Sequence, residues 1–163
     1  MVSRPPAIVR ALALAALVLG FAAPLPAAPR ARPDGVGQSA PVRSLKTVDG
    51  GSVPLGEGDG VTHLLFVARW CGPCETEVHA LRRAAVQIRR QGGQVVLVGV
   101  ARRQTAQEFT EWARGLGFDG PLVFDDGGRV ESAFGADLIP WHVVVGAGGR
   151  IMHSGDSRPA PSA

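Results

Sequence analysis

The chain has 163 residues, which is the length of a single domain. Apolar residues make up 45 % of it and charged residues 19 %, a globular composition that argues against a disordered chain. The sequence pI of about 9.6 would suit a nucleic-acid-binding protein. Four arginines, however, fall in the first 32 residues, which contain no acid, and the remainder has 13 basic and 14 acidic side chains. We therefore expect no nucleic-acid partner.

The first 28 residues are predicted to be a secretory signal peptide. Arg4 and Arg10 form a basic region before and at the edge of an apolar run at residues 11–23, and prolines and small residues follow. This run is shorter than the ~20 residues of a transmembrane helix, although an uncleaved N-terminal anchor is the alternative. Residues 29–40 are rich in Pro, Gly and Arg and are interpreted as a linker. The sequence thus predicts an exported protein, periplasmic or otherwise extracytoplasmic.

Residues 41–156 predict one α/β domain, followed by a tail at residues 157–163. The expected strands are residues 42–47, 53–55, 63–68, 95–100, 122–124, 143–145 and 150–153. The expected helices are residues 72–91 and 105–117, with a helical turn at residues 130–134. The runs at residues 63–68 and 95–100 are almost entirely apolar, which is typical of strands buried on both faces. Alternating strands and helices that end in a hairpin predict a mixed sheet.

Both cysteines of the chain lie in the motif Trp70-Cys71-Gly72-Pro73-Cys74, between a predicted buried strand and the first helix. Two intervening residues on the first turn of a helix bring the sulfurs close enough for a disulfide. They also place the first sulfur near unpaired backbone N–H groups, which favour its thiolate. Cys71 is therefore the expected nucleophile, and Cys74, one turn into the helix, the thiol that resolves a mixed disulfide. Pro73 fits the first helical turn, and Trp70 is expected to shield the pair.

Two other interpretations of the cysteines are less favoured. A purely structural disulfide would close a loop of two residues, which constrains the unfolded chain very little. A zinc or copper site would need two further ligands, and the candidates, which are scattered, are His63, His79, His142 and His153. The redox interpretation is preferred because the strand, the motif and the helix occur in the order that the chemistry needs. It requires no cofactor beyond the redox-active pair itself.

The motif and its surroundings resemble the thioredoxin superfamily, and in particular its exported TlpA/ResA branch. Four segments carry the resemblance: LLFVARWCGPCETE, VVLVGVARRQTAQEFTEWARGLGF, PLVFDDGGRVESAFGA and LIPWHVVVGAGGRI. Together they cover about residues 40–156. The resemblance implies a thioredoxin-like fold, with a mixed central sheet flanked by helices, a short N-terminal hairpin, and Cys71 and Cys74 as the attacking and resolving thiols.

The resemblance also implies further site residues. In the family, the X-Pro bond that matches Ile139-Pro140 is cis and packs beside the disulfide, and the backbone of the residue before the proline pairs with an extended substrate. Without the family match, Pro140 would be interpreted as an ordinary loop proline at the start of a strand. The expected substrate-contacting residues are Trp70, Gly72, Pro73, Ile139, Pro140 and Trp141.

Glu77 matches a glutamate that this branch places near the active-site thiols. It follows Cys74 by one helical turn, so contact is geometrically plausible. The alternative is that Glu77, like Glu75, only complements the positive end of the helix dipole.

The sequence departs from the family pattern at four places. Leu65 stands where thioredoxin has a buried Asp, so a proton acceptor for Cys74 must be sought elsewhere. His79 replaces a proline that kinks the first helix, and Trp141 replaces a Thr after the cis-proline, where it is expected to enlarge or narrow the apolar surroundings of the thiols. No C-terminal helix is expected after the last strand.

The resulting functional prediction is an exported thiol:disulfide oxidoreductase that acts as a monomer on a cysteine pair of another exported protein. The family suggests reduction of the haem-binding cysteines of apocytochrome c, with electrons from a membrane thiol-disulfide donor. The alternative is a copper-binding metallochaperone that uses the same thiols, since soft thiolates select Cu(I). A peroxidase of the related redoxin group is weakened because no isolated Cys stands in a separate Pro-rich loop. The thioredoxin-like dipeptide Gly72-Pro73 predicts a reductant.

Overall fold

The computed structural model describes residues 35–159, and the predicted signal peptide lies outside them. Its main sheet has the strand order β5-β4-β3-β6-β7. These strands are β3 (Thr62–Val67), β4 (Gln94–Val100), β5 (Leu122–Asp125), β6 (Trp141–Val145) and β7 (Ile151–Gly155). Strands β3, β4 and β5 run parallel, whereas β6 pairs antiparallel with both β3 and β7. The predicted mixed sheet is therefore confirmed.

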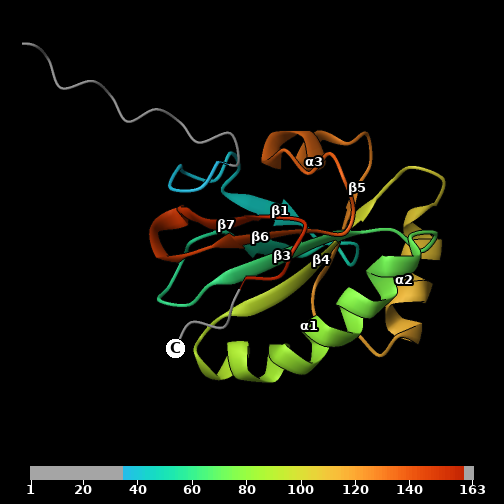
Figure 1. The fold of residues 1–163 in the computed structure, drawn as a ribbon, viewed down its shortest axis with the longest axis horizontal. Coiled ribbons are helices and arrows are strands. Elements are labelled where there is room, and N and C mark those ends of the chain that lie inside the picture. The colour runs from blue at the N-terminus through green and yellow to red at the C-terminus, as the bar shows by residue number, and fades with distance from the viewer. Residues whose placement is uncertain (1–34, 160–163) are drawn as a thin grey trace, which may run out of the picture.

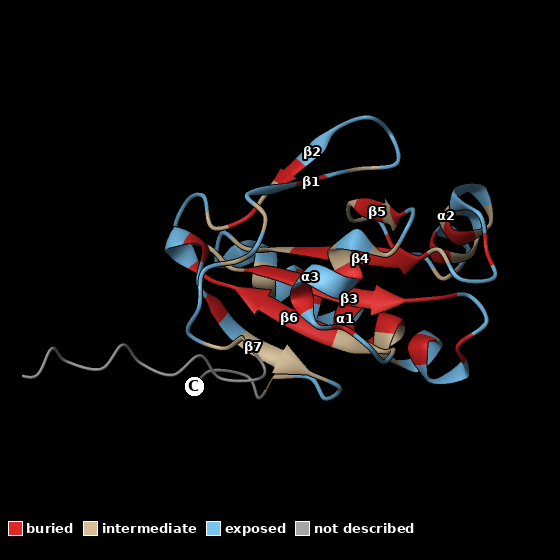
Figure 2. Ribbon diagram, turned by 90° about the horizontal axis from the view of Figure 1, so that it is seen from above, coloured by how far each residue is buried: buried red, intermediate tan, exposed pale blue. Residues whose placement is uncertain are grey.

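Helices and a hairpin cover both faces of this sheet. Helices α1 (Gly72–Arg90) and α2 (Ala106–Gly115) lie on one face, and the short helix α3 (Arg129–Phe134) lies on the other (Figure 1). The antiparallel hairpin of β1 (Ser44–Lys46) and β2 (Ser52–Pro54) packs on the α3 face. Strands β3 and β4 are consequently buried along almost their whole length, as Figure 2 shows. Their continuous apolar runs in the sequence reflect this burial from both sides.

Helix α1 begins directly at the cysteine motif. Cys71 is its N-cap residue with extended backbone angles, and Pro73 occupies the first turn, where its missing N–H leaves no bond unmade. One side of the helix packs against the sheet through Cys74, Val78, Ala80, Leu81 and Ala85. The helix stops before Gly92, whose φ of 75° lies in the left-handed region that glycine adopts without strain.

Helix α2 is held by its cap and by one close contact. Thr105 and Glu108 form a reciprocal capping box, as their spacing predicts. The ring of Phe109 then packs directly on Gly99 of β4, where an added Cβ would come within 2.6 Å of the ring. Any side chain at position 99 would clash with this ring. Glycine at this position therefore allows α2 to pack close to the sheet.

The ends of the domain differ from the sequence-based boundaries. Residues 35–40, which were expected to belong to a linker, contact the sheet: Ser39 forms a bridge with Arg150, and the Ala40 N–H donates to Gly149 O at 2.7 Å. The packed unit thus begins before residue 41.

Strand β6 also differs from its predicted bounds. It starts at Trp141 rather than at residue 143, because Trp141 still pairs with Phe66 of β3.

The hairpin between β6 and β7 turns through a 3-10 segment, Ala147–Gly149, and within the described residues no helix follows β7. Among residues 35–159, no helix is both long and apolar enough to cross a bilayer.

Candidate active site

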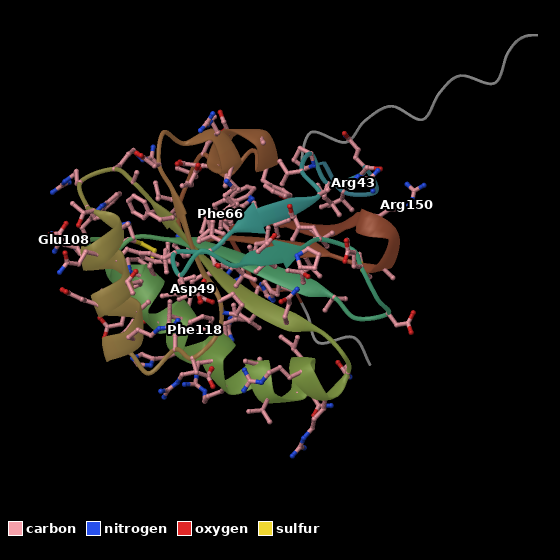
Figure 3. All side chains as sticks on the ribbon, turned by 180° about the vertical axis from the view of Figure 1, so that it is seen from behind. Arg43, Asp49, Phe66, Glu108, Phe118 and Arg150 are labelled. Carbon is pink, nitrogen blue, oxygen red and sulfur yellow. A yellow bond between two sulfur atoms is a disulfide. The ribbon has the colours of Figure 1, made fainter. Side chains whose placement is uncertain are left out.

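The two cysteines form a disulfide at the junction of β3 and α1, drawn as the yellow bond in Figure 3. Their Cα atoms lie 5.3 Å apart. Cys71 retains 8 % of its surface exposed, whereas Cys74 retains none. Of the two residues, only Cys71 therefore has surface that another molecule can reach. This asymmetry supports the predicted order of attacking and resolving thiols.

The start of α1 places Cys71 in a positive electrostatic environment. As the N-cap residue it lies outside the helix but next to the backbone N–H groups of the first turn. Gly72 and Pro73 are both exposed, so little side-chain bulk covers the sulfur from the solvent side. The positive end of the helix dipole at this position stabilises an anion such as a thiolate.

The loop before β6, which contains the Ile139–Pro140 bond, also lies beside the disulfide. The Ile139–Pro140 peptide bond is cis, as the family resemblance implied. The Ile139 carbonyl oxygen lies 3.8 Å from Cys71 Sγ, and the Ile139 side chain packs against both apolar cores. The fold thus joins two segments separated by 68 residues, so that backbone groups of Ile139 border the more exposed sulfur.

The Trp70 side chain is held beside the motif by the loop that follows β4. Its indole N–H donates to the Arg102 carbonyl, and the Arg103 guanidinium lies 5.4 Å from the ring centroid. Trp70 keeps 37 % of its surface exposed, and Leu138, next to the cis-proline loop, keeps 66 %. Both exposed apolar side chains belong to the segments that border Cys71.

Sequence reasoning missed Gln104, which fixes the backbone in front of the motif. Its side-chain oxygen accepts the Arg69 N–H at 3.0 Å, and its side-chain nitrogen donates to the Val100 carbonyl. Arg69 itself forms an ion pair of 2.7 Å with Glu108, the partner of Thr105 in the capping box of α2. The feature of the sequence that could have pointed to Gln104 is its position directly before the N-cap residue Thr105. Gln104 thereby connects the end of β4 to the residues that lead into the dithiol.

Trp141 is not brought together with the cysteines. Its register partner is Phe66, so its side chain points to the face that carries α3, and its indole N–H donates to Ser154 Oγ at 3.1 Å. The expectation that Trp141 lines the thiols is therefore not met by this structure. The physical reason is that successive side chains of a strand point to opposite faces of the sheet.

Glu77 lies on the face of α1 that meets the sheet and contacts two basic groups. Its Oε2 lies 3.4 Å from His142 Nε2 of β6 and 2.8 Å from Arg158 Nε in the segment after β7. His142 Nδ1 in turn lies 3.0 Å from His63 Nε2 of β3. Burial is the main cause that lowers the pKa of His63 to about 3 and that of His142 to about 4, so both are neutral near pH 7.

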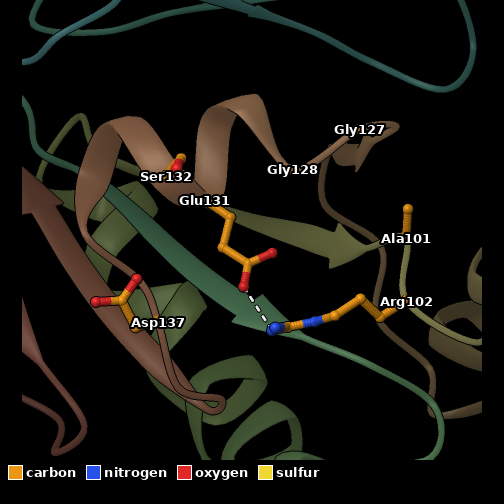
Figure 4. A pocket seen from close by; sticks show the side chains of 7 residues that line it. All are labelled: Ala101, Arg102, Gly127, Gly128, Glu131, Ser132 and Asp137. Atoms are coloured by element: carbon orange, nitrogen blue, oxygen red, sulfur yellow. Dashed lines mark hydrogen bonds and ion pairs between the residues drawn. The ribbon is translucent and has the colours of Figure 1, made fainter.

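A polar groove of about 540 Å³ adjoins the Trp70 side of the site (Figure 4). An ion pair between Arg102 and Glu131 crosses it, and burial raises the pKa of the Glu131 carboxyl. The groove is lined by Ala101, Arg102, Gly127, Gly128, Glu131, Ser132 and Asp137. The Arg102 backbone carbonyl also accepts the Trp70 N–H, so the groove is continuous with the surroundings of the motif. In the described part of the chain, no three His, Cys, Asp or Glu side chains gather in a metal-binding arrangement.

The fold and the site together define a thioredoxin-fold protein with a dithiol at the start of its first long helix. The chain belongs to the AhpC/TSA family, whose model matches residues 36–154. It is 31 % identical over 116 residues to the thiol-disulfide oxidoreductase ResA of Halalkalibacterium halodurans, covering 68 % of this chain and 64 % of that protein. The ResA of Geobacillus thermodenitrificans is 28 % identical, covering 71 % and 66 % respectively. The chain therefore spans just under two thirds of the length of these relatives.

Comparison with solved structures shows the same fold. The thioredoxin domain of a thiol-disulfide oxidoreductase from Bacteroides vulgatus superposes with a TM-score of 0.63 at 20 % identity. That alignment covers 73 % of this chain and 86 % of the other. The thioredoxin-like architecture expected from the sequence is confirmed.

Proposed function

We propose that this protein is an extracytoplasmic thiol:disulfide oxidoreductase that works through Cys71 and Cys74. The observation that carries the proposal is the difference between the two sulfurs: Cys71 is the partly exposed N-cap of α1, and Cys74 is fully buried behind it. The resemblance to two proteins named ResA thiol-disulfide oxidoreductase supports the same activity. The signal-like N-terminal sequence supports export.

In the proposed reaction, the Cys71 thiolate attacks one sulfur of a substrate disulfide. A bond forms between Cys71 and that sulfur, and the second substrate sulfur leaves as a thiolate that takes up a proton. Cys74 then loses its proton and attacks Cys71, which releases the first substrate sulfur and re-forms the Cys71–Cys74 disulfide. The substrate gains two electrons, and the protein dithiol loses two.

The proposed substrate is a cysteine pair in an extended segment of another exported protein, such as the haem-binding cysteines of apocytochrome c. The Ile139 backbone beside the sulfur is suited to pair with an extended chain, and exposed Trp70 and Leu138 offer apolar contacts on either side. A membrane thiol-disulfide donor is proposed to return the protein to the dithiol form. The substrate contacts predicted for Gly72, Pro73 and Pro140 belong to the same proposal.

The test uses a peptide that contains one disulfide between the cysteines of a haem-attachment motif. The reduced protein is expected to reduce it, Cys71→Ser to lose the activity, and Cys74→Ser to accumulate a mixed disulfide visible by mass spectrometry. Because both variants remove one thiol, each serves as the other's control for general loss of the disulfide. Accumulation of the adduct in Cys71→Ser instead would contradict the proposed roles.

The copper alternative is separated by titration of the same reduced protein with Cu(I). Thiolates bind this ion in preference to harder metals, and binding is expected to compete with peptide reduction. Tight binding of one Cu(I) in a protein that leaves the peptide disulfide intact would replace the oxidoreductase proposal by a metallochaperone.

A further inference from the structure

Four polar side chains form a continuous row between α1 and the sheet. Arg158 contacts Glu77, Glu77 contacts His142, and His142 contacts His63, with separations of 2.8, 3.4 and 3.0 Å between the facing atoms. They come from the segment after β7, from α1, from β6 and from β3, and so meet only in the folded protein. We call these four residues the histidine row.

The inner part of the histidine row is costly for folding. His142 has no exposed surface and His63 has 4 %. Among the described residues, His142 Nε2 is buried without a hydrogen-bond partner, although it faces Glu77 Oε2, an oxygen that is itself paired with Arg158. A buried polar atom in this state destabilises the fold by about 1–3 kcal/mol, and an apolar residue would avoid that cost. The cross-strand neighbour of His142 is Leu65, so an apolar side chain would fit the surroundings.

Glu77, a member of the histidine row, lies one helical turn after the resolving thiol. Glu77 follows Cys74 by three residues on α1, which places the two side chains on the same helix face. His142 shares a register position with Leu65, and Leu65 belongs to the same core cluster as both cysteines. Leu65 cannot accept a proton, whereas Glu77 can.

We propose that His142 and His63 are positioning residues that hold the Glu77 carboxylate in place to take the proton of Cys74. The inference rests on the proposed function and deepens it. In this proposal His142 carries its proton on Nε2, the atom that faces Glu77 Oε2 at 3.4 Å, and its Nδ1 accepts the Nε2–H of His63. Each histidine then has one proton and no charge, which agrees with their lowered pKa values.

This arrangement acts in the second half of the exchange. The Cys74 proton passes to the Glu77 carboxylate as the Cys74 sulfur bonds to Cys71. The bond between Cys71 and the substrate sulfur breaks, and that sulfur leaves with the electron pair as a thiolate. Attack by Cys71 on the substrate precedes this step and does not depend on the histidine row.

Other charged groups surround the row and must be held constant in a test. Arg158 contacts the carboxylate directly, and His153 of β7 and Asp156 affect the pKa of His142 in opposite directions. On the exposed side of α1, His79 lies 3.7 Å from Glu75. Variants at His142 and His63 keep all of these groups, so a comparison among them reports the histidine row alone.

The test follows the reaction of the reduced protein with 5,5′-dithiobis(2-nitrobenzoate) between pH 5 and pH 9. The first equivalent of released thiolate reports attack by Cys71, and the second reports resolution by Cys74. We expect His142→Leu to slow the second release about tenfold at pH 7 and to move its pH profile to higher pH, with the first release unchanged. His142→Gln, which keeps an N–H near the position of Nε2, is expected to restore most of the rate. His63→Leu is expected to have a smaller effect in the same direction.

The matched control is His79→Gln, a histidine on α1 outside the row, which is expected to leave both releases unchanged. A folded His142→Leu protein with the wild-type second rate and pH profile would overturn the inference. So would imidazole ¹⁵N NMR of the wild-type protein that places the His142 proton on Nδ1, a measurement that needs no variant. A wild-type protein that releases no second equivalent would instead contradict the proposed function itself.

Discussion

At the scale of single residues, the two cysteines differ in exposure because they occupy different positions at the start of α1. Cys71 precedes the helix and keeps a small exposed surface, whereas Cys74 points into the core. The same turn places Glu77 toward the sheet, where it meets His142. Arg69, the cation nearest to the motif in sequence, is paired with Glu108 and so is partly neutralised for the thiols.

The first prediction concerns the carboxylate of Glu77. Glu77→Gln keeps the size of the side chain but removes the carboxylate that is proposed to accept the proton of Cys74, so the resolving step is expected to slow by roughly tenfold or more. Stopped-flow measurement of mixed-disulfide resolution across pH 5–9 checks this. Glu75→Gln, on the exposed side of the same helix, is the control. Equal effects of the two substitutions would assign Glu77 only to the helix dipole.

The second prediction concerns acid stability. Because His63 and His142 have pKa values of about 3 and about 4 in the folded protein, the unfolded chain binds more protons between these values and 6.5. The free energy of unfolding is therefore expected to be constant above pH 6.5 and to fall as pH decreases below it, by at most about 1.4 kcal/mol per pH unit for each histidine.

Urea unfolding at pH 7, 6 and 5 measures this dependence. The change of the unfolding free energy per pH unit is expected to decrease in His142→Leu. It is expected to persist in His79→Gln, whose imidazole is exposed. An unchanged slope in His142→Leu would show that other groups cause the loss of stability in acid.

At the scale of elements, α2 supports the site although it carries no thiol. Its N-cap Thr105 follows Gln104, which holds the Arg69 backbone, and its Glu108 pairs with the Arg69 side chain. The ring of Phe109 anchors the helix on Gly99. Displacement of the start of α2 would thus also loosen the segment that leads into the motif.

The third prediction tests this cap. Thr105→Ala removes the acceptor of the Glu108 N–H and is expected to lower the free energy of unfolding by about 1 kcal/mol, with a Tm lower by a few degrees. Thr110→Ala, in the interior of the same helix, is the control, because alanine has the higher helix propensity there. A Thr105→Ala protein as stable as the wild type would mean that the contact of Phe109 alone holds the helix start.

At the scale of the whole molecule, one sheet separates two apolar cores and positions the dithiol just after the carboxyl end of its central strand, β3. The core between the sheet and α1 and α2 contains both cysteines, whereas the core under α3 and the hairpin contains Phe66 and Phe134. Ile139 contacts both cores from the cis-proline loop, so the loop beside Cys71 is fixed by the packing of the whole domain.

The fourth prediction is that the protein is a reductant. Gly72-Pro73 is the dipeptide of thioredoxin, whose potential is about −270 mV, whereas the strong oxidant DsbA lies near −120 mV because its reduced form is stabilised. No cation lies between the cysteines here, and Arg69 is engaged by Glu108. Equilibration with glutathione is expected to give a potential below roughly −150 mV. A higher value would assign the protein to the oxidants.

The fifth prediction concerns export. The apolar run at residues 11–23 is expected to direct secretion and to be removed, so the mature chain is expected to start between Pro24 and Pro33. Mass spectrometry of the extracytoplasmic fraction measures this start. An intact Met1 in the membrane fraction would indicate an anchor instead.

Much of the fold and the place of the cysteine pair at the start of α1 could be predicted from sequence because both depend on local interactions. Apolar periodicity defined β3, β4 and α1 to within a residue or two. The capping box located the start of α2, and the position of Cys71 just before a helix predicted its anion-stabilising environment.

Only the tertiary structure decided which distant side chains meet. His63, Glu77 and His142 are far apart in the sequence, where the histidines were considered only as scattered metal ligands and Glu77 as a glutamate near the thiols or a charge at the helix start. The register between β3 and β6 places His142 toward α1 and Trp141 toward α3, and a shift of one residue would exchange them. That register is determined by the packing of two cores on one sheet, a long-range property that no local pattern in the chain encodes.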